Sequence, residues 1–453
     1  MSKIIRTSQK TGQPIAIISF EEYSEAQSQS AELAKDIDTQ AQDVNRSIDV
    51  ATALEELMVV ADNIEQATPE EANLIELGGN IAVAGTGVTP EQIVPSLESF
   101  IGGKISLEEL GLKEKIKKIW ELIAKTLSEI WSKISEFIET SFVMVAYVIN
   151  ELRKVKGIVK DLKNARIRSE KMDLDVSRFG TIFNDGAQFL NDAGSIKQSL
   201  DKTRDQFKNF FENYVNSLTN LGDNLGKDIN SINKENIAKV VSDLNGSLLL
   251  DQRKLFSTLF YRVSKTESDR VVKTTAEEKG SGLTSFSFNT DFLGGISYTV
   301  TAPANNVVFP TFPILVDRLK VSQIKINKPD LTKIAKVANL NQPYELGEIE
   351  QLLDATLSLM ETIRTFKDRQ QSKITQARKR LEQGSKALKS LEVEGADAEN
   401  VKALMSLNLI YMNWARNPLI GLVQHAVRIG RAISWLSKSN LAYYEVPSKQ
   451  IKK

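Results

Sequence analysis

The feature that most restricts the fold of this chain is a long series of apolar residues spaced three or four positions apart, between residues 112 and 137. The series is Leu112, Ile116, Trp120, Ile123, Leu127, Ile130, Ile134 and Phe137. This spacing places every member on one face of a helix, where it can pack against other helices as in a heptad seam. Similar helical patterns cover residues 185–220, 225–260, 345–391 and 398–436. The sequence therefore predicts a mainly α fold, a long-helix bundle.

The periodicity changes from the helical value to two between residues 270 and 328. Alternating apolar and polar residues predict short strands, and the glycines and prolines between them predict turns. The residues that we place in strands are Leu283, Ser285–Phe288, Ile296, Tyr298, Val300, Leu319, Val321, Ile324 and Ile326. We expect a small β insert at 270–328, between a helical domain at 109–269 and a basic C-terminal helical domain at 329–453.

Acidic and basic residues are unequally distributed along the chain, although its formal net charge is zero. Residues 1–108 contain 18 aspartates and glutamates but 6 lysines and arginines, a net charge of −12, and the remaining residues carry +12. Residues 28–66 also follow a helical pattern. An acidic segment attached to a basic body weakens the attraction of that body for polyanions. We therefore predict that 1–108 is an acidic helical segment and a candidate propeptide. The alternative is that two domains simply differ in isoelectric point.

The chain has no cysteine and one histidine, His425, which excludes disulfides, thiolate catalysis and cysteine-ligated metal sites. A lone histidine in a helical stretch is more often a structural residue than a metal ligand. Gly85-Thr86-Gly87 lacks the Gly-Lys-Ser/Thr ending of a phosphate-binding loop and is typical of a linker. We therefore predict that the protein is not an enzyme, and we assign no catalytic, cofactor-binding or metal-binding residue.

Residues 364–389 contain nine lysines and arginines and only two acidic residues. A helix with this charge can follow the phosphates of double-stranded DNA without reading its bases. The alternative is a solvated helix face, or a face that meets acidic residues elsewhere in the fold. The candidate contacts to DNA phosphates are Lys373, Arg378, Lys379, Arg380, Lys386 and Lys389.

The tripeptide Ser/Ala-x-Glu occurs seven times, and five of these occurrences lie before residue 109. Ser96-Leu97-Glu98 and Ser106-Leu107-Glu108 are identical and lie just before the change in charge. They fall in a predicted linker, and an exposed, extended linker is where proteases cut. Glu98 and Glu108 are therefore candidate cleavage sites, although a glutamate-rich sequence also produces such triplets by chance.

The acidic segment, the Ser-Leu-Glu triplets, the basic helical body and the absence of cysteine together resemble the internal head proteins of giant phiKZ-like bacteriophages. The resemblance implies a propeptide that a prohead protease removes by cutting after glutamate, at Glu98 or Glu108 in this chain. It also implies a virion structural protein that is made in the host cytoplasm and stays with packaged DNA and other internal head proteins in the capsid interior. Ejection into the host is a further expectation. The resemblance supplies no catalytic residue.

Two other functions remain open at this point. A helical pore-forming toxin also combines long helices with an apolar hairpin, and residues 142–149 and 286–316 would then be the parts that enter a membrane. The helix with Trp120 and Trp131 can also lie at a membrane interface, although its spacing favours burial in a bundle. A membrane is a partner only in this interpretation, and no apolar run reaches the ~18 residues of a membrane-spanning helix. The third function is an assembly scaffold that does not bind DNA.

Overall fold

The computed structural model describes most of the chain from residue 112 onward and short stretches before it. The described residues are 5–7, 14–16, 35–36, 38–46, 49–51, 53, 66–67, 105–106, 112–167, 174–175, 179–184, 189–258, 271–275, 283–289, 292–304, 307–327, 339–389, 391, 393 and 395–445. The chain divides into two units, residues 36–139 and residues 1–35 with 140–453. Helix α3 (Leu112–Asp161) crosses the boundary between the two units.

The unit of residues 36–139 contains the acidic segment from residue 36 onward. Its described residues before position 54 are helical and include the buried Val44 and Ala51. This agrees with the acidic helix predicted for this part of the sequence. Farther along, strand β3 (Gln66–Ala67) pairs antiparallel with β4 (Ile105–Ser106).

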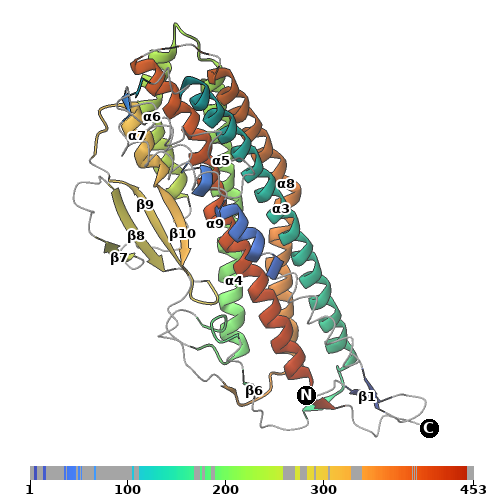
Figure 1. Ribbon diagram of the computed structural model, residues 1–453. Helices are drawn as coiled ribbons and strands as arrows, with labels where there is room; N and C mark the ends of the chain where they lie inside the picture. Colours follow the sequence, from blue (N-terminus) through green and yellow to red (C-terminus); the bar gives the residue numbers. More distant parts are fainter. Residues whose placement is uncertain are drawn as a thin grey trace. The chain divides into compact units, whose positions relative to one another are not determined.

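Long helices that lie side by side form the core of the other unit (Figure 1). They are the part of α3 after residue 139, α4 (Ala193–Asn209) with its continuation α5 (Val215–Asn230), α8 (Leu346–Lys389) and α9 (Ala396–Leu441). Helix α8 packs along α4, α5 and α9. At 1.5 Å per residue, the 44 residues of α8 extend about 66 Å. These helices confirm the predicted mainly α bundle.

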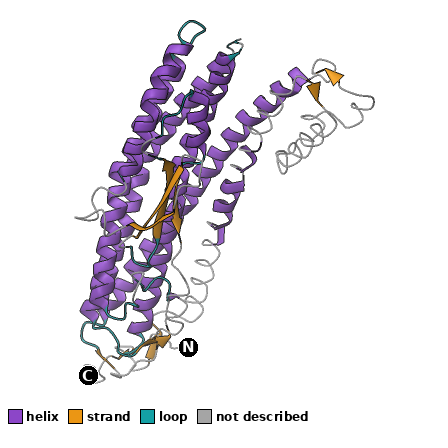
Figure 2. Cartoon of the chain, turned by 90° about the vertical axis from the view of Figure 1, so that its left-hand side faces the viewer, coloured by secondary structure: helices purple, strands orange, loops and turns teal. Residues whose placement is uncertain are grey.

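A four-stranded antiparallel sheet lies on one side of the helices (Figure 2). Its strands are β7 (Val271–Thr275), β8 (Leu283–Asn289), β9 (Ser297–Pro303) and β10 (Gln323–Asn327), in the spatial order β10-β9-β8-β7. Strand β10 packs on α9. Two shorter helices, α6 (Ile237–Ser257) and α7 (Phe312–Lys320), contact β9, α9 and each other. The small β insert is therefore confirmed.

Three short strand pairs lie outside the four-stranded sheet in this unit. They are β1 (Ile5–Thr7) with β2 (Pro14–Ala16), β5 (Arg166–Ile167) with β12 (Tyr444–Glu445), and β6 (Leu174–Asp175) with β11 (Asn339–Leu340). Two of the three join residues more than 150 positions apart, so they fix the ends of the helical core.

Helix α7 corrects part of the predicted strand pattern. Leu319 lies in the last turn of α7 and Val321 is its C-cap residue, so the prediction of a strand at these two positions was wrong. Pro313 lies in the first turn of α7, where a proline needs no hydrogen-bond donor and its fixed φ suits the helix. Ile324 and Ile326 do lie in a strand, β10.

Glycines let α5 approach its two neighbours closely. A Cβ atom on Gly222 would lie 2.6 Å from Tyr411 Cε2 of α9, and one on Gly226 would lie 2.8 Å from Arg380 Cβ of α8. From the other side, a Cβ atom on Gly384 of α8 would lie 2.6 Å from Ile229 Cγ2. No side chain larger than hydrogen fits these positions unless the neighbouring atoms shift, so the glycines permit the close packing of the helices.

A π-helical turn, η4 (Phe210–Tyr214), joins α4 to α5. Its aromatic rings are buried, and Phe211 stacks on Phe366 of α8 with ring centroids 4.2 Å apart. The Tyr214 hydroxyl reaches α9, where it donates a hydrogen bond of 2.8 Å to the carbonyl of Trp414. The π-helical turn therefore contacts both α8 and α9 at the point where α4 continues into α5.

Candidate nucleic-acid interface

The basic part of α8 has one buried face and one exposed face. Ile374, Ala377, Leu381 and Leu388 are buried, at intervals of three, four and seven residues, so the apolar face continues into the basic segment. The exposed positions between residues 372 and 387 are Ser372, Lys373, Gln376, Lys379, Gln383, Lys386 and Ala387. This exposed face, which we call the α8 lysine face, carries lysines and neutral residues but no carboxylate.

Two of the six candidate residues belong to the α8 lysine face and have no acidic partner among the described residues. Lys373 and Lys379 are exposed and have no ion-pair partner within the described part of the chain. Lys386 is also exposed, with 67% of its side chain accessible, and lies 3.1 Å from Glu382 on the same helix. An exposed pair of this kind is weak, so Lys386 can exchange its partner for a phosphate.

The two candidate arginines are held by acidic residues instead. Arg380 Nη1 lies 2.9 Å from Asp223 Oδ1 of α5, and Arg378 Nη2 lies 3.4 Å from Glu382 Oε2. Only 18% of the Arg378 side chain is exposed. The expected alternative, a basic face that meets acidic residues elsewhere in the fold, therefore applies to Arg380, whereas Arg378 and Lys386 pair with Glu382 of the same helix.

The sequence pattern gave no sign of the Asp223–Arg380 pair. Residues 223 and 380 are far apart in the chain, and only the close approach of α5 to α8 at Gly226 brings them together. Lys389 is the last residue of α8, and its side chain lies outside the described residues. The role of each candidate in binding DNA stays a prediction.

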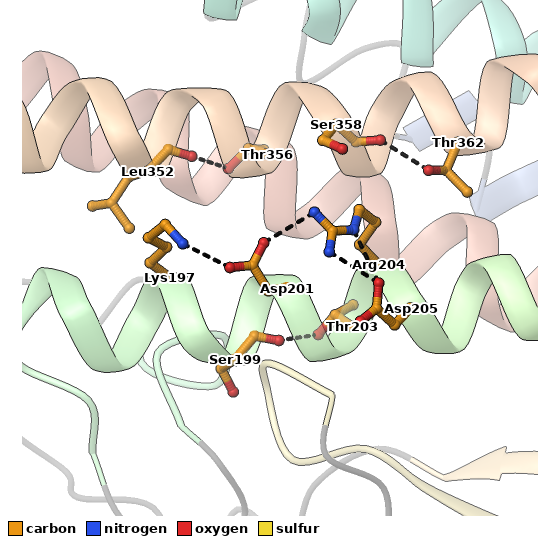
Figure 3. A network of polar contacts seen from close by, with 10 residues as sticks. All are labelled: Lys197, Ser199, Asp201, Thr203, Arg204, Asp205, Leu352, Thr356, Ser358 and Thr362. Atoms are coloured by element: carbon orange, nitrogen blue, oxygen red, sulfur yellow. Dashed lines mark hydrogen bonds and ion pairs between the residues drawn. The ribbon is translucent and has the colours of Figure 1, made fainter. Parts of the chain in front are cut away.

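The surface of α4 beside α8 differs from the α8 lysine face because its charges are paired within the helix (Figure 3). Asp201 accepts from Lys197 Nζ at 2.7 Å and from Arg204 Nη1 at 3.1 Å, and Arg204 also reaches Asp205 at 2.9 Å. Opposite them, the hydroxyls of Thr356 and Thr362 bond to carbonyls of their own helix (Figure 3). This surface contains carboxylates and is a poor candidate for phosphate binding.

Both candidate cleavage sites, Glu98 and Glu108, lie outside the described residues, as does the glycine-rich stretch at residues 85–87. The backbone of Ser106, two residues before Glu108, is described and forms strand β4. Cleavage at either glutamate stays a prediction.

The single histidine is buried in the core. His425 Nε2 donates a hydrogen bond of 2.6 Å to the carbonyl of Leu293, in the turn between β8 and β9. Burial lowers the pKa of His425 to about 4, with a smaller contribution from Arg428, while the bond to Leu293 acts in the opposite direction. Among the described residues, no group of three or more metal-ligating side chains comes together.

The segment at residues 142–149, which the toxin interpretation assigns to a membrane, lies in the helical core. Phe142, Val145, Val148 and Ile149 are buried, while Val143 is 58% exposed. Among the described helices, none combines the length and the hydropathy that a membrane span requires. The side chains of Trp120 and Trp131 are outside the described residues.

Comparison with known proteins identifies the family of the chain. No curated protein and no solved structure matches it. The family model of the phiKZ-like phage internal head proteins does match, over residues 21–433, and the match covers most of the acidic segment, the sheet and the α8 lysine face. The protein therefore has a structural role in the virion, inside the capsid. Because the match extends over most of its length, the chain belongs to the phiKZ-like phage internal head proteins.

Proposed function

We propose that the mature protein binds packaged double-stranded DNA without sequence preference, through the α8 lysine face, after a prohead protease has removed the acidic N-terminal segment. The observation that carries the proposal is the exposure of Lys373, Lys379 and Lys386 on one side of α8, where the exposed positions between residues 372 and 387 include no aspartate or glutamate and the half-buried Glu382 pairs with Lys386. Lysines on one side of a helix neutralise phosphates as point charges and read no base.

Removal of the acidic segment would change the net charge of the chain from zero to +12. Residues 1–108 carry −12 and residues 109–453 carry +12. Charges more than about 10 Å apart are largely screened at moderate salt, so the acidic segment has to lie near the basic face to mask it. In this proposal the chain is made in the host cytoplasm in its masked form, enters the prohead with other internal head proteins and is cut there. Ejection into the host with the DNA would follow.

The DNA part of the proposal is tested by salt-dependent binding. The fragment of residues 109–453 and the full chain are compared on a duplex without a specific site, and we expect the fragment to bind more tightly. The variant is Lys373→Gln, Lys379→Gln and Lys386→Gln. The logarithm of the binding constant falls linearly with the logarithm of the salt concentration. For the variant, the magnitude of this slope should be smaller by about 0.9 for each phosphate that it no longer neutralises. Its control is Lys202→Gln, Lys234→Gln and Lys239→Gln, three exposed lysines on and near α4 and α6. Equal slopes in the variant and the control would remove the α8 lysine face from the proposal.

The processing part is tested on protein from phage particles. Mass spectrometry of the mature N-terminus should find it at residue 99 or residue 109. A chain with Glu98→Gln and Glu108→Gln should stay uncut at both positions. A mature chain that still begins at Met1 or Ser2 would show that residues 1–108 are a permanent domain.

A further inference from the structure

The sheet has a face on which polar side chains bond to one another across three strands. The hydroxyls of Ser285 and Thr301 are 2.9 Å apart, and those of Ser287 and Thr299 are 3.0 Å apart. From β10, Asn327 Nδ2 donates to Thr299 Oγ1 at 2.7 Å. The antiparallel register aligns these residues, so they occupy the same side of β8, β9 and β10.

The opposite side of the sheet is covered by the helices. Tyr298 and Val300 of β9 and Ile324 of β10 are buried. Ile326 approaches α9 so closely that a Cβ atom on Gly421 would lie 3.0 Å from its Cδ1 atom. Since successive side chains of a strand point to opposite faces, the hydroxyl-bearing side points away from the helices.

The charged residues in the strands of the sheet are all basic. None of its four strands contains aspartate or glutamate, whereas β10 contains Lys325, which is exposed. Beside it, Gln323 Oε1 accepts a hydrogen bond from Asn417 Nδ2 of α9 at 3.3 Å, and Asn417 Oδ1 accepts from Arg416. A surface that needs only to be soluble mixes charges of both signs.

We propose that this polar sheet face binds the phosphodiester backbone of nucleic acid. The face consists of Ser285, Ser287, Ser297, Thr299, Thr301, Gln323, Lys325 and Asn327. The inference rests on the proposed function and adds a second contact surface to the α8 lysine face.

Hydrogen-bond donors decide which partner fits. Each hydroxyl carries one hydrogen. The half-buried pair of Ser287 and Thr299 uses one of its two hydrogens for the bond between them, so the second can be donated to a further acceptor. Ser297 Oγ accepts from Asn327 at 3.4 Å and keeps its own hydrogen for a further partner. The polar sheet face therefore offers hydrogen-bond donors and a lysine but no carboxylate. Such a face complements an anionic partner that is rich in hydrogen-bond acceptors. Serine, threonine, asparagine and glutamine are regular donors to phosphate oxygens. The bonds between them hold the side chains in place before binding, which reduces the entropy lost on association.

Crosslinking tests the contact directly. Because the chain has no cysteine, Gln323→Cys introduces a single thiol that can carry a photo-crosslinker. The control is Gln198→Cys, which replaces an exposed glutamine on α4. With a duplex of about 30 base pairs at low salt, we expect crosslinked DNA from the sheet position and little from α4. Equal crosslinking at both positions would overturn the inference.

Charge reversal supplies the quantitative test. Lys325→Glu with Gln323→Glu adds the same negative charge as Lys202→Glu with Gln198→Glu on α4, and all four positions are exposed. We expect the sheet variant to lose about tenfold in affinity beyond the control, at unchanged far-UV circular dichroism. A loss equal to that of the control, while the unmodified 109–453 fragment binds DNA, would overturn only the sheet inference. A fragment that binds no DNA would overturn the proposed function as well.

Discussion

The hydroxyl of Tyr214 in η4 donates its hydrogen bond to the main-chain carbonyl of Trp414 in α9. Trp414 is four residues before Pro418, which lies inside α9 and has no N–H with which to bond that carbonyl. Tyr214 therefore replaces the missing helix donor. Burial raises the pKa of Tyr214, which keeps the hydroxyl protonated. This bond explains how α9 continues as one helix through a proline.

Replacing Tyr214 should show this role in a double-mutant cycle. Tyr214→Phe leaves a buried carbonyl without a donor, and we expect a loss of about 1–3 kcal/mol in the free energy of unfolding. In a Pro418→Ala background the backbone N–H of residue 418 bonds the carbonyl, so the loss should be smaller. Urea denaturation of the four proteins measures the coupling. If the effects of the two substitutions on the free energy of unfolding are additive, Tyr214 does not act through Pro418.

The burial of His425 predicts that stability falls in acid. Its pKa in the folded protein is about 4, below the ordinary value of 6.5, so the unfolded chain binds the proton more readily. This contribution is complete above pH 6.5 and is lost as the pH falls from 6.5 to about 4, to a limit of about 3 kcal/mol. His425→Gln should flatten the pH dependence of the urea midpoint in this window. An unchanged profile would assign the acid sensitivity to carboxylates.

Glycine replacements should separate close helix contacts from open positions. Gly226→Ala and Gly384→Ala place a methyl group where only hydrogen fits, and we expect each to cost about 1–3 kcal/mol. Gly246→Ala in α6 is the control, since a Cβ atom there meets nothing within 4 Å. It should stabilise the helix by up to about 1 kcal/mol. Thermal unfolding measures all three, and equal effects would contradict the close packing.

Arg380 and Lys379 are neighbours with different expected roles. Arg380→Gln removes the ion pair with Asp223, which is partly exposed, so we expect a loss of at most about 1 kcal/mol in stability. Lys379→Gln should leave stability unchanged and weaken DNA binding. Measuring both quantities for both variants tests the division. A large effect of Arg380→Gln on DNA affinity alone would place the arginine on the binding surface.

The spacing of apolar residues is sufficient to predict the long helices. It does not predict well where they end or which elements they contact. The apolar spacing of α3 and α8 and the alternation in β8 and β9 are local signals, and the elements lie where these signals occur. The sequence pattern does not predict helix α7, because Pro310 and Pro313 are typical of turns, although Pro313 also fits a first helical turn.

The candidate site was predictable in part, because exposure depends on tertiary packing. The sequence placed nine basic residues on one segment but could not distinguish Lys379, which is exposed and unpaired within the described part of the chain, from Arg380, which contacts Asp223. The polar sheet face gave no sequence signal of its own, because isolated serines and threonines in strands are ordinary.

The π-helical turn between α4 and α5 has a consequence for how the length of the chain can vary. Each residue added to or removed from a helix rotates everything beyond it by about 100°. Deleting one residue within Phe210–Tyr214 would turn Gly222 and Gly226 away from α9 and α8 and put bulkier side chains in their place. The number of residues in η4 therefore determines how α5 is rotated about its own axis, and so which of its residues face α8 and α9.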